Sequence, residues 1–452
     1  MAFVVEKTHN IAIPNDIISE IIDILAAERP PDPNAIDLGP DTEWSWPDED
    51  LHDPPGRLQV KKFHTLSSFC LQRARKHIFA AVKLGTNYPQ YTCNRPPKHL
   101  STLTSQLAFF EEHKGTLPHI RRLSLDIKQK ELVDSSLQEK LYDAMVEMSN
   151  LSFLSISLND LVWAHPGLSS TSKSVQSALR TLLRSSQNLT EVYLRNVFKF
   201  RLNDLVDAPY LQGLYVDIDE STFFVDGDKL ELNSLKKLII CRIRQPKYFE
   251  QFVNVLVDRD GNGNLVLTLP QLKVFEFGIE SSSELPEFLK IVNAHGGSLE
   301  ELSFHLSLDR EPGHNDYSTW LNELILPRKQ TLQKISISSS LLDESQNPFA
   351  GLCSTLLRMD EDNVLAELHI EVHVQTDCNC TLGDEWLEFS RVLDTNKKWK
   401  HLRRVTIVVV VADFGRSDRA LQTALDGLRN THLKALFSRP FEFELRVRTV
   451  IV

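Results

Sequence analysis

Leu299-Glu-Glu-Leu302-Ser-Phe304 decides the fold of this chain, because the same spacing of apolar residues recurs along most of its length. Apolar residues occupy the first, fourth and sixth positions of this six-residue template. It occurs ten times, beginning at Ile120, Leu151, Leu189, Leu211, Leu235, Leu272, Leu299, Leu332, Leu365 and Leu402. Successive starts lie 22 to 38 residues apart, with a mean of about 31. The recurrence predicts an array of similar units, each contributing one strand.

Helical patterns lie between most of these templates. Leu137, Leu141 and Met145 follow one another at intervals of four residues, the spacing of one face of an α-helix. Comparable sets are Leu103, Leu107 and Phe110; Val175, Leu179 and Leu182; Phe249, Phe252 and Leu256; Leu285, Phe288 and Leu289; Trp320, Leu321 and Leu324; and Trp386, Phe389 and Leu393. We therefore expect strand and helix to alternate throughout this part of the chain.

A unit of this size cannot bury its apolar face alone, so neighbouring units must stack and share one core. Parallel strands are joined by crossovers such as helices, so the predicted fold is an α/β solenoid with a parallel sheet on the concave side of a horseshoe. The template resembles that of leucine-rich repeats, which span about 20 to 29 residues. Residues 100–452 are thus expected to form an irregular array of about ten such units. The alternating segment Phe441–Val452 is expected to add a terminal capping strand.

The sequence predicts a separate helical module in residues 11–90. Residues 13–27, with Pro14 at a first helical position, carry the apolar stripe of an amphipathic helix. Residues 28–57 hold seven prolines, nine acidic residues and two basic ones, the composition of an exposed acidic insert. Helical spacing resumes at Leu58, and two further short helices end in an extended segment near Leu84.

This module resembles an F-box, the helical motif that docks its owner onto the Skp-type adaptor of a cullin ubiquitin ligase. The resemblance rests on Ile13-Pro14 and the Ser19-Glu20-Ile21-Ile22 run, and on residues 64–84, HTLSSFCLQRARKHIFAAVKL. It implies that the adaptor contacts an apolar face made of Ile13, Pro14, Ile17, Ile18, Ile21 and Leu66. The alternative is that residues 11–84 only cap the first repeat, because the end of an array needs a polar cover.

Side chains alternate along a strand, so the residues between the apolar template positions point to the concave face. This face combines mixed charge with tyrosine, as protein interfaces do. We expect a partner or substrate protein to contact Glu191, Tyr193, Arg195, Tyr215, Asp217, Glu301, His305, His369 and Glu371. The alternative is a solvated sheet face without a ligand, since exposed polar residues need no function.

Composition disfavours several classes of protein. The chain has 452 residues, 42% hydrophobic and 25% charged, which is near the globular average, and it has no apolar run long enough to span a bilayer. The net charge of −11 and the lack of a Lys/Arg stripe disfavour nucleic acid as a partner. The first ten residues lack a signal-peptide pattern, and six scattered cysteines suit a reducing compartment. We expect a cytoplasmic or nuclear protein without membrane contact.

Two constellations suggest metal chemistry. Asp258–Leu265 resembles the first eight positions of a calcium loop, but Leu269 stands where the twelfth position needs a glutamate, so a Gly/Asn turn is preferred. The segment HIEVH, residues 369–373, puts two histidines and a glutamate on one strand face near Cys378 and Cys380, but the spacing matches no zinc motif. The sequence also lacks phosphate-loop, nucleophile-elbow and zinc-protease motifs. We expect no metal, no cofactor and no enzymatic activity.

The preferred interpretation is a substrate receptor of a Skp-cullin-F-box ubiquitin ligase. Such a receptor docks on the adaptor through its N-terminal helices and holds an unknown substrate protein on the repeat array. It acts by raising the concentration of the substrate near a ubiquitin-charged enzyme, without making bonds itself. The alternative is a non-catalytic leucine-rich-repeat scaffold that binds proteins and has no part in ubiquitination.

Overall fold

A single parallel sheet organises the chain. The computed structural model describes residues 80–85, 103–128, 134–159, 175–206, 208–218, 221–227, 229–241, 243, 245–306, 317–341, 347–375, 384–394, 398–413 and 419–451. Within these residues the sheet has twelve strands in chain order, and all neighbours are parallel. The strands are β1 (Ala81–Gly85), β2 (Arg122–Lys128), β3 (Phe153–Asn159), β4 (Glu191–Arg195), β6 (Gly213–Val216), β9 (Lys237–Ile240), β11 (Val274–Ile279), β12 (Glu301–Leu306), β13 (Lys334–Leu341), β14 (Glu367–Gln375), β15 (Arg404–Asp413) and β16 (Glu442–Ile451).

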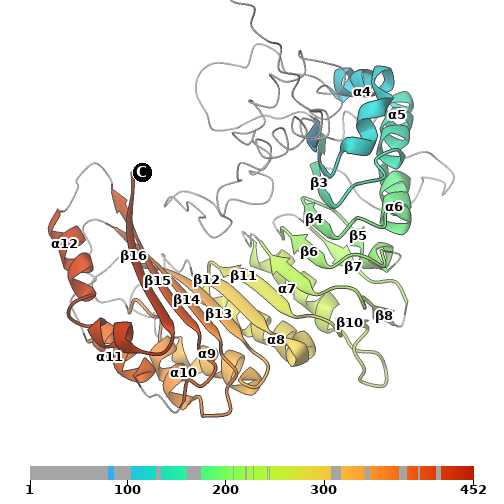
Figure 1. Cartoon of the computed structure of the whole chain (residues 1–452). Helices are drawn as coiled ribbons and strands as arrows, with labels where there is room; N and C mark the ends of the chain where they lie inside the picture. The colour runs from blue at the N-terminus through green and yellow to red at the C-terminus, as the bar shows by residue number, and fades with distance from the viewer. Residues whose placement is uncertain are drawn as a thin grey trace, which may run out of the picture.

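The sheet lines the inner side of a curved array, and the helices follow its outer side (Figure 1). The α-helices are α4 (Leu103–Glu112), α5 (Ser135–Val146), α6 (Val175–Ser185), α7 (Pro246–Val257), α8 (Leu285–His295), α9 (Ser318–Ile325), α10 (Leu352–Arg358), α11 (Glu385–Leu393) and α12 (Arg419–Leu428). Short 3₁₀ helices are η3 (Lys114–His119), η5 (Leu202–Leu205), η6 (Ser282–Glu284), η7 (Gly296–Ser298), η8 (Leu326–Arg328) and η9 (Lys434–Ser438). The expected leucine-rich-repeat-like α/β solenoid with a concave parallel sheet is confirmed.

Each of the ten sequence templates contains the start of one strand. In every case the first apolar residue lies two residues before the strand, as Leu299 precedes Glu301 of β12. That residue is at most 6% exposed in all ten units, because it fills the space below the turn that leads into the strand. The two end strands, β1 near Leu84 and β16 within Phe441–Val452, also lie where the sequence indicated.

The expected alternation of strand and helix is wrong between β4 and β9. The two units that begin at Leu189 and Leu211 are only 22 and 24 residues long. Their outer side holds η5 and the short strands β5 (Phe200–Arg201), β7 (Phe223–Phe224) and β8 (Leu230–Glu231), of which β5 pairs with β7, and β8 with β10 (Leu267–Thr268). In these two shortest units, extended and 3₁₀ segments return the chain, and they span more distance per residue than an α-helix does.

A continuous chain of backbone hydrogen bonds links the units at the point where each strand begins. The N–H of Ser152 donates to the carbonyl of Arg121, and the carbonyl of Ser152 accepts from Thr190 in the next unit. Nine such bonds, each 2.7 to 3.0 Å long, run without a break from Arg121 to Arg403. They fix every unit at the same register relative to its neighbours.

The core is one apolar cluster that extends from Leu84 to Phe441 between the sheet and the outer layer. Its widest part is aromatic. The ring of Phe277 on β11 stacks on Phe288 of α8 at 4.0 Å and lies 5.7 Å from Phe304 on β12. Each unit therefore packs against the next through side chains as well as through the sheet.

Basic side chains of one unit bind the C-terminal end of the helix in the unit before it. His295 Nε2 donates to the Leu256 carbonyl of α7 at 2.9 Å, and Lys398 Nζ donates to the Leu357 carbonyl of α10 at 2.5 Å. Buried Arg328 donates to the carbonyls of Val292 on α8 and Leu324 on α9, at 2.8 and 2.9 Å. The positive charges of Arg328 and Lys398 are favourable there, because the last carbonyls of a helix carry partial negative charge. Burial lowers the pKa of His295, which donates as a neutral imidazole.

We predict that Arg328→Met lowers the free energy of unfolding by about 2 to 3 kcal/mol, because two buried helix-end carbonyls lose their donor. Urea titration followed by circular dichroism measures the effect. Lys290→Met is the matched control, since Lys290 is half exposed and pairs only with Glu287 of its own helix; it should change stability by less than about 0.5 kcal/mol. Equal urea midpoints for the Arg328→Met and Lys290→Met variants would show that the hydrogen bonds of Arg328 do not stabilise the contact between α8 and α9.

Candidate protein interface on the inner face

The parallel register aligns the inner-face side chains in rows that cross the sheet. The first row joins the first residues of the strands, from Arg122 of β2 to Glu442 of β16. The next rows lie two and four residues further along each strand, because only alternate side chains share a face. The inner-face residues expected from the sequence therefore form ordered rows.

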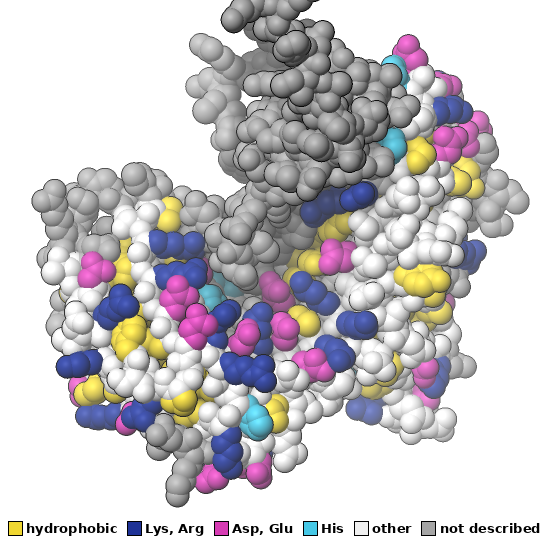
Figure 2. All heavy atoms as spheres, viewed as in Figure 1, with side chains coloured by type: hydrophobic (Ala, Val, Ile, Leu, Met, Phe, Trp, Pro, Cys, Tyr) yellow, Lys and Arg dark blue, Asp and Glu magenta, His cyan; other side chains and the backbone are white. Residues whose placement is uncertain are grey.

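Charges of alternating sign occupy the first row over the last five strands. We call these residues the charge ladder: Glu301, Lys334, Glu367, Arg404 and Glu442. Lys334 Nζ lies 3.4 Å from Glu301 Oε2, and Arg404 Nε lies 3.1 Å from Glu442 Oε2. These four side chains are 40 to 63% exposed, so each pair contributes under about 1 kcal/mol. Figure 2 shows Lys and Arg side chains interleaved with Asp and Glu side chains over this half of the array.

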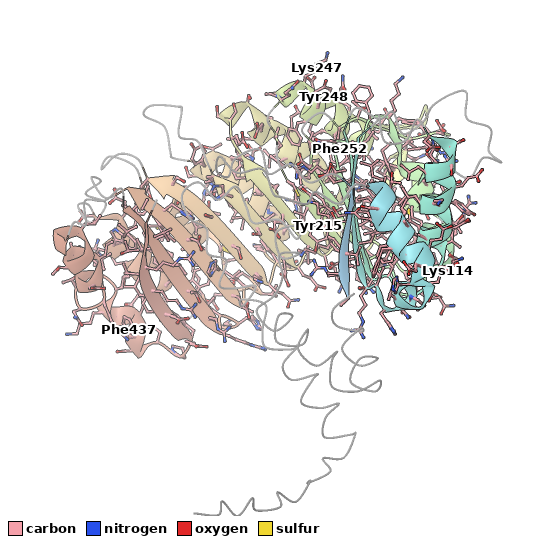
Figure 3. The ribbon with its side chains drawn as sticks, turned by 90° about the horizontal axis from the view of Figure 1, so that it is seen from above. Lys114, Tyr215, Lys247, Tyr248, Phe252 and Phe437 are labelled. Carbon is pink, nitrogen blue, oxygen red and sulfur yellow. The ribbon has the colours of Figure 1, made fainter. Side chains whose placement is uncertain are left out.

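A second apolar core lies on the inner face, separate from the main core. We call it the aromatic cluster: Phe153, Tyr193, Tyr215, Ile239 and Cys241. The Tyr215 ring, midway along the array in Figure 3, meets both Phe153 and Tyr193 edge to face at 6.4 Å. Arg122 lies 4.6 Å from the centre of the Phe153 ring, and Lys237 Nζ lies 5.2 Å from that of Tyr215. Cations over aromatic faces add attraction that is not available to aliphatic residues.

Two polar pairs flank the aromatic cluster. The Tyr215 hydroxyl donates to Glu191 Oε1 at 3.3 Å; burial raises the pKa of Tyr215, and the Glu191 charge raises it further, so the phenol stays neutral. Arg195 Nε lies 3.7 Å from Oδ2 of the buried Asp217. The structure thus brings together five of the predicted binding residues, including Tyr193. Tyr193 and Asp217 are fully buried, so they support the face, and Glu191 and Arg195 are more accessible on it.

A polar cluster occupies the inner face of the last third of the array. We call it the histidine–glutamate cluster: His305, His369, Glu371, His373 and Arg448. Glu371 Oε1 lies 2.8 Å from His373 Nε2 and 3.5 Å from Arg448 Nη2. Glu371 Oε2 lies 4.0 Å from His369 Nε2. One buried carboxylate from β14 therefore gathers cationic or hydrogen-bonding groups from two strands.

Burial and neighbouring charges set the protonation of this cluster. Burial by itself raises the pKa of Glu371, but the hydrogen bond from His373 and the charge of Arg448 lower it on balance, so the carboxyl is ionised. Burial lowers the pKa of His305 to about 4, and His373 adds to the effect. His305 is therefore neutral near pH 7, and its Nδ1 lies 2.8 Å from Ser338 Oγ. Burial also lowers the pKa of His369.

The two constellations considered for metals have other roles in the structure. Asp260 Oδ1 accepts from the backbone N–H groups of Asn262 and Asn264, at 2.8 and 2.9 Å, so its carboxylate closes a tight turn. His369 and His373 both face Glu371, and Cys378 and Cys380 lie outside the described residues. No group of three or more His, Cys, Asp or Glu side chains in the described part of the chain is arranged to hold a metal ion.

The predicted binding residues thus form two groups on one face. Glu301 belongs to the charge ladder and lies on β12, the strand that also carries His305 of the second group. Sequence reasoning missed Ile239 and Cys241, although an apolar residue at an inner-face position is itself a signal of burial there. It also missed Arg448, which the alternation of β16 placed on the same face as Glu371.

The adaptor-binding residues inferred from the F-box resemblance, namely Ile13, Pro14, Ile17, Ile18, Ile21 and Leu66, lie outside the described residues. The same holds for the acidic insert, residues 28–57. Among the helices that the structure describes, none has the length and apolar character needed to cross a membrane.

We predict that His305→Asn flattens the dependence of stability on pH between about 6.5 and 4. In wild type, unfolded His305 takes up a proton in this window and folded His305 does not, so the free energy of unfolding falls as pH falls. The variant should lack this fall in the free energy of unfolding, which is on the order of 2 kcal/mol. Urea titrations at pH 7, 5.5 and 4 measure it. Exposed His401→Asn is the control; identical slopes in wild type and His305→Asn would contradict a lowered pKa of His305 in the folded chain.

No protein-family model matches the chain, and no curated protein matches its sequence. Among solved structures, it is similar to a crystal structure of an internalin from Listeria monocytogenes, at 10% identity over 86% of this chain and 93% of that chain, with a TM-score of 0.25. The strand order and register, independently of that likeness, give the chain the architecture of a leucine-rich-repeat-like solenoid.

Proposed function

We propose that this chain is a non-catalytic protein-interaction scaffold that binds a protein partner on the inner face of its sheet. The observation that carries the proposal is the aromatic cluster, a second apolar core on the face opposite the main core. A solvated sheet face has no need of tyrosine rings that meet edge to face and are flanked by two cations. Interfaces, in contrast, are enriched in tyrosine and arginine at their centres.

The buried charges of the same face support this reading. Asp217 and Glu371 are buried, and burying a carboxylate costs free energy unless it is paired. Asp217 is paired with Arg195 of the neighbouring strand β4, and Glu371 is paired with Arg448 of β16, two strands away. Fixed charges of this kind contribute orientation and specificity to binding more than affinity.

The partner that fits is a protein with its own mixed charge. The charge ladder alternates in sign, so it repels a polyanion such as nucleic acid at every second position. A folded protein or an extended segment with complementary spacing meets each position with the opposite charge.

We expect the paired substitution Lys334→Ala and His369→Ala to weaken partner binding at least about tenfold, because both side chains are accessible on the inner face. The partner is found by cross-linking and mass spectrometry, and its affinity is then measured by calorimetry. The control pair, Lys140→Ala and Lys290→Ala, changes exposed lysines on outer helices and should leave the affinity within about twofold. Equal weakening by both pairs would place the interface elsewhere.

A finer proposal is that the scaffold is the substrate receptor of a Skp-cullin-F-box ubiquitin ligase. Its support is the F-box resemblance of residues 13–27 and 64–84, joined to a repeat array of the kind that holds substrates. In that role Ile17 and Ile18 contact the Skp-type adaptor, and the inner face presents the substrate to the ligase.

We expect the full chain to retain the purified Skp-type adaptor in a pull-down, and the substitutions Ile17→Asp and Ile18→Asp to abolish retention by removing apolar contacts. Ser19→Asp, on the polar side of the same helix pattern, is the control and should bind as wild type does. Circular dichroism reports whether each variant keeps the array folded. No retention by the wild-type chain leaves the scaffold without a ubiquitination role.

A further inference from the structure

The last strand of the sheet, β16, has a long and regular edge. It pairs with β15 over all ten of its residues without a bulge, and within the described residues it has no second neighbour in the sheet. Sheet edges in natural proteins are usually short, bulged, interrupted by proline or covered, because an open edge pairs with other chains. Between Glu442 and Ile451 there is no proline.

The backbone of β16 is oriented to pair on its outer side. The N–H of Glu442 donates to the carbonyl of Arg403 at 2.8 Å. Backbone groups of successive strand residues point to opposite sides, so residues with even numbers bond to β15. The N–H and carbonyl groups of Phe443, Leu445 and Val447 therefore point to the open edge.

The apolar side chains of β16 are less covered than those of the strand beside it. Phe443, Leu445 and Val447 are only partly buried, whereas their partners on β15, such as Ile407, are completely buried. Phe437 lies at the same end of the array in Figure 3; it is 38% exposed and meets the Phe443 ring edge to face at 4.8 Å. A further strand along this edge would extend the apolar layer.

The charges of β16 are complementary to themselves when the strand is reversed. The sequence from position 442 reads Glu-Phe-Glu-Leu-Arg-Val-Arg. If two copies pair antiparallel about a two-fold axis at Leu445, Glu444 stands opposite Arg446, and Glu442 stands opposite Arg448. In the same arrangement Phe443 faces Val447. Opposite charges and apolar pairs directly across a strand pair both stabilise it.

We propose that two copies of this chain associate through β16, forming an antiparallel strand pair centred on Leu445. The sheet of one copy then continues into that of the other. The arrangement is isologous, as in most homodimers: both copies use the same surface, and each contact between two residues occurs twice, related by the two-fold axis.

Other registers of the same pair are unfavourable. An axis at Glu444 puts that glutamate opposite itself, and an axis at Arg446 does the same for the arginine, so like charges meet. An axis between two residues places each charged side chain of one copy opposite an apolar side chain of the other copy, so that the inner face of one sheet continues into the outer face of the other. In that register the free N–H and carbonyl groups of one copy also lie opposite groups of the other copy that are already bonded to β15. Of these axes, the one at Leu445 satisfies both the side chains and the backbone.

The ion pairs within one copy are compatible with this arrangement. Arg446 Nε already lies 2.6 Å from Glu444 Oε1 of the same strand, and a second copy adds the same pair in reverse order. The four charges then alternate in sign around the axis. Arg448 holds Glu371 on the inner face at 3.5 Å and gains Glu442 of the other copy as an additional partner.

Sedimentation velocity on the full chain tests the proposal. At micromolar concentration the sedimenting species should have twice the mass of one chain, which is 51.6 kDa. Glu444→Arg and Arg446→Glu should each raise the dissociation constant of the dimer about tenfold or more, because each creates two like-charge contacts. Glu250→Arg, a charge reversal at an exposed site on α7, is the control and should leave the constant unchanged.

Mixing the two edge variants separates register from damage to the fold. In a mixed dimer, two arginines of the Glu444→Arg chain face two glutamates of the Arg446→Glu chain, so affinity should return to within about threefold of wild type. Misfolded chains would not regain it. Failure of the mixture to associate, or a wild-type chain that stays monomeric at tens of micromolar, overturns the proposal, as does unchanged dimerisation of both single variants.

A cysteine placed on the axis measures the register directly. Opposed residues of a hydrogen-bonded antiparallel pair have Cα atoms about 5.5 Å apart, a separation that a disulfide spans. Leu445→Cys should therefore form a covalent dimer under mild oxidation, above the level of the wild-type chain with its six cysteines. Phe443→Cys should not, since its two copies lie more than about 13 Å apart along the strands. Cross-linking at position 443 instead of 445 would contradict the stated axis.

Discussion

The unbroken chain of backbone hydrogen bonds across the units is the constraint on which the rest of this structure depends. The strands β4, β6 and β9 have only four or five residues, and strands that short are unstable without partners on both sides. Because the bonds from Arg121 to Arg403 set one register for all units, the apolar template residues of every unit enter the same core. The same register brings side chains from four or more strands into one row on the opposite face.

The outer layer depends on a different set of contacts. Its helices are too short to be stable alone, and packing against the core supplies most of their stability. His295, Arg328 and Lys398 add a polar link from three of the units to the helix before each of them. These units are therefore joined twice, by the sheet inside and by polar side chains at helix ends outside, and such contacts between neighbours give a repeat array its cooperativity.

Much of the fold was predictable because the core has strict periodicity. A leucine or isoleucine two residues before the strand and apolar residues within it occur in every one of the ten units, so the pattern survives irregular spacing. The outer layer is less constrained, and nothing in the template indicated that the units starting at Leu189 and Leu211 lack helices, apart from their length.

The alternation of side chains predicted which residues lie on the inner face, but it did not predict which of them are buried there. Tyr193 and Asp217 occupy positions that alternation assigns to solvent, and the structure buries both. Burial at such a position depends on side chains from strands 20 or more residues away, and a single sequence does not show which of these converge. The cation links between helices were missed for the same reason.

The absence of α-helices between β4 and β9 within the described residues also changes the thickness of the outer layer. Strands lie about 4.8 Å apart, whereas packed helices need about 10 Å, and this mismatch favours bending of a solenoid. Where extended segments replace helices, this source of bending is weaker. The aromatic cluster, from β3 to just after β9, spans the units that lack helices, and the histidine–glutamate cluster lies on units backed by helices. The two clusters on one continuous sheet are therefore supported by outer layers of different thickness.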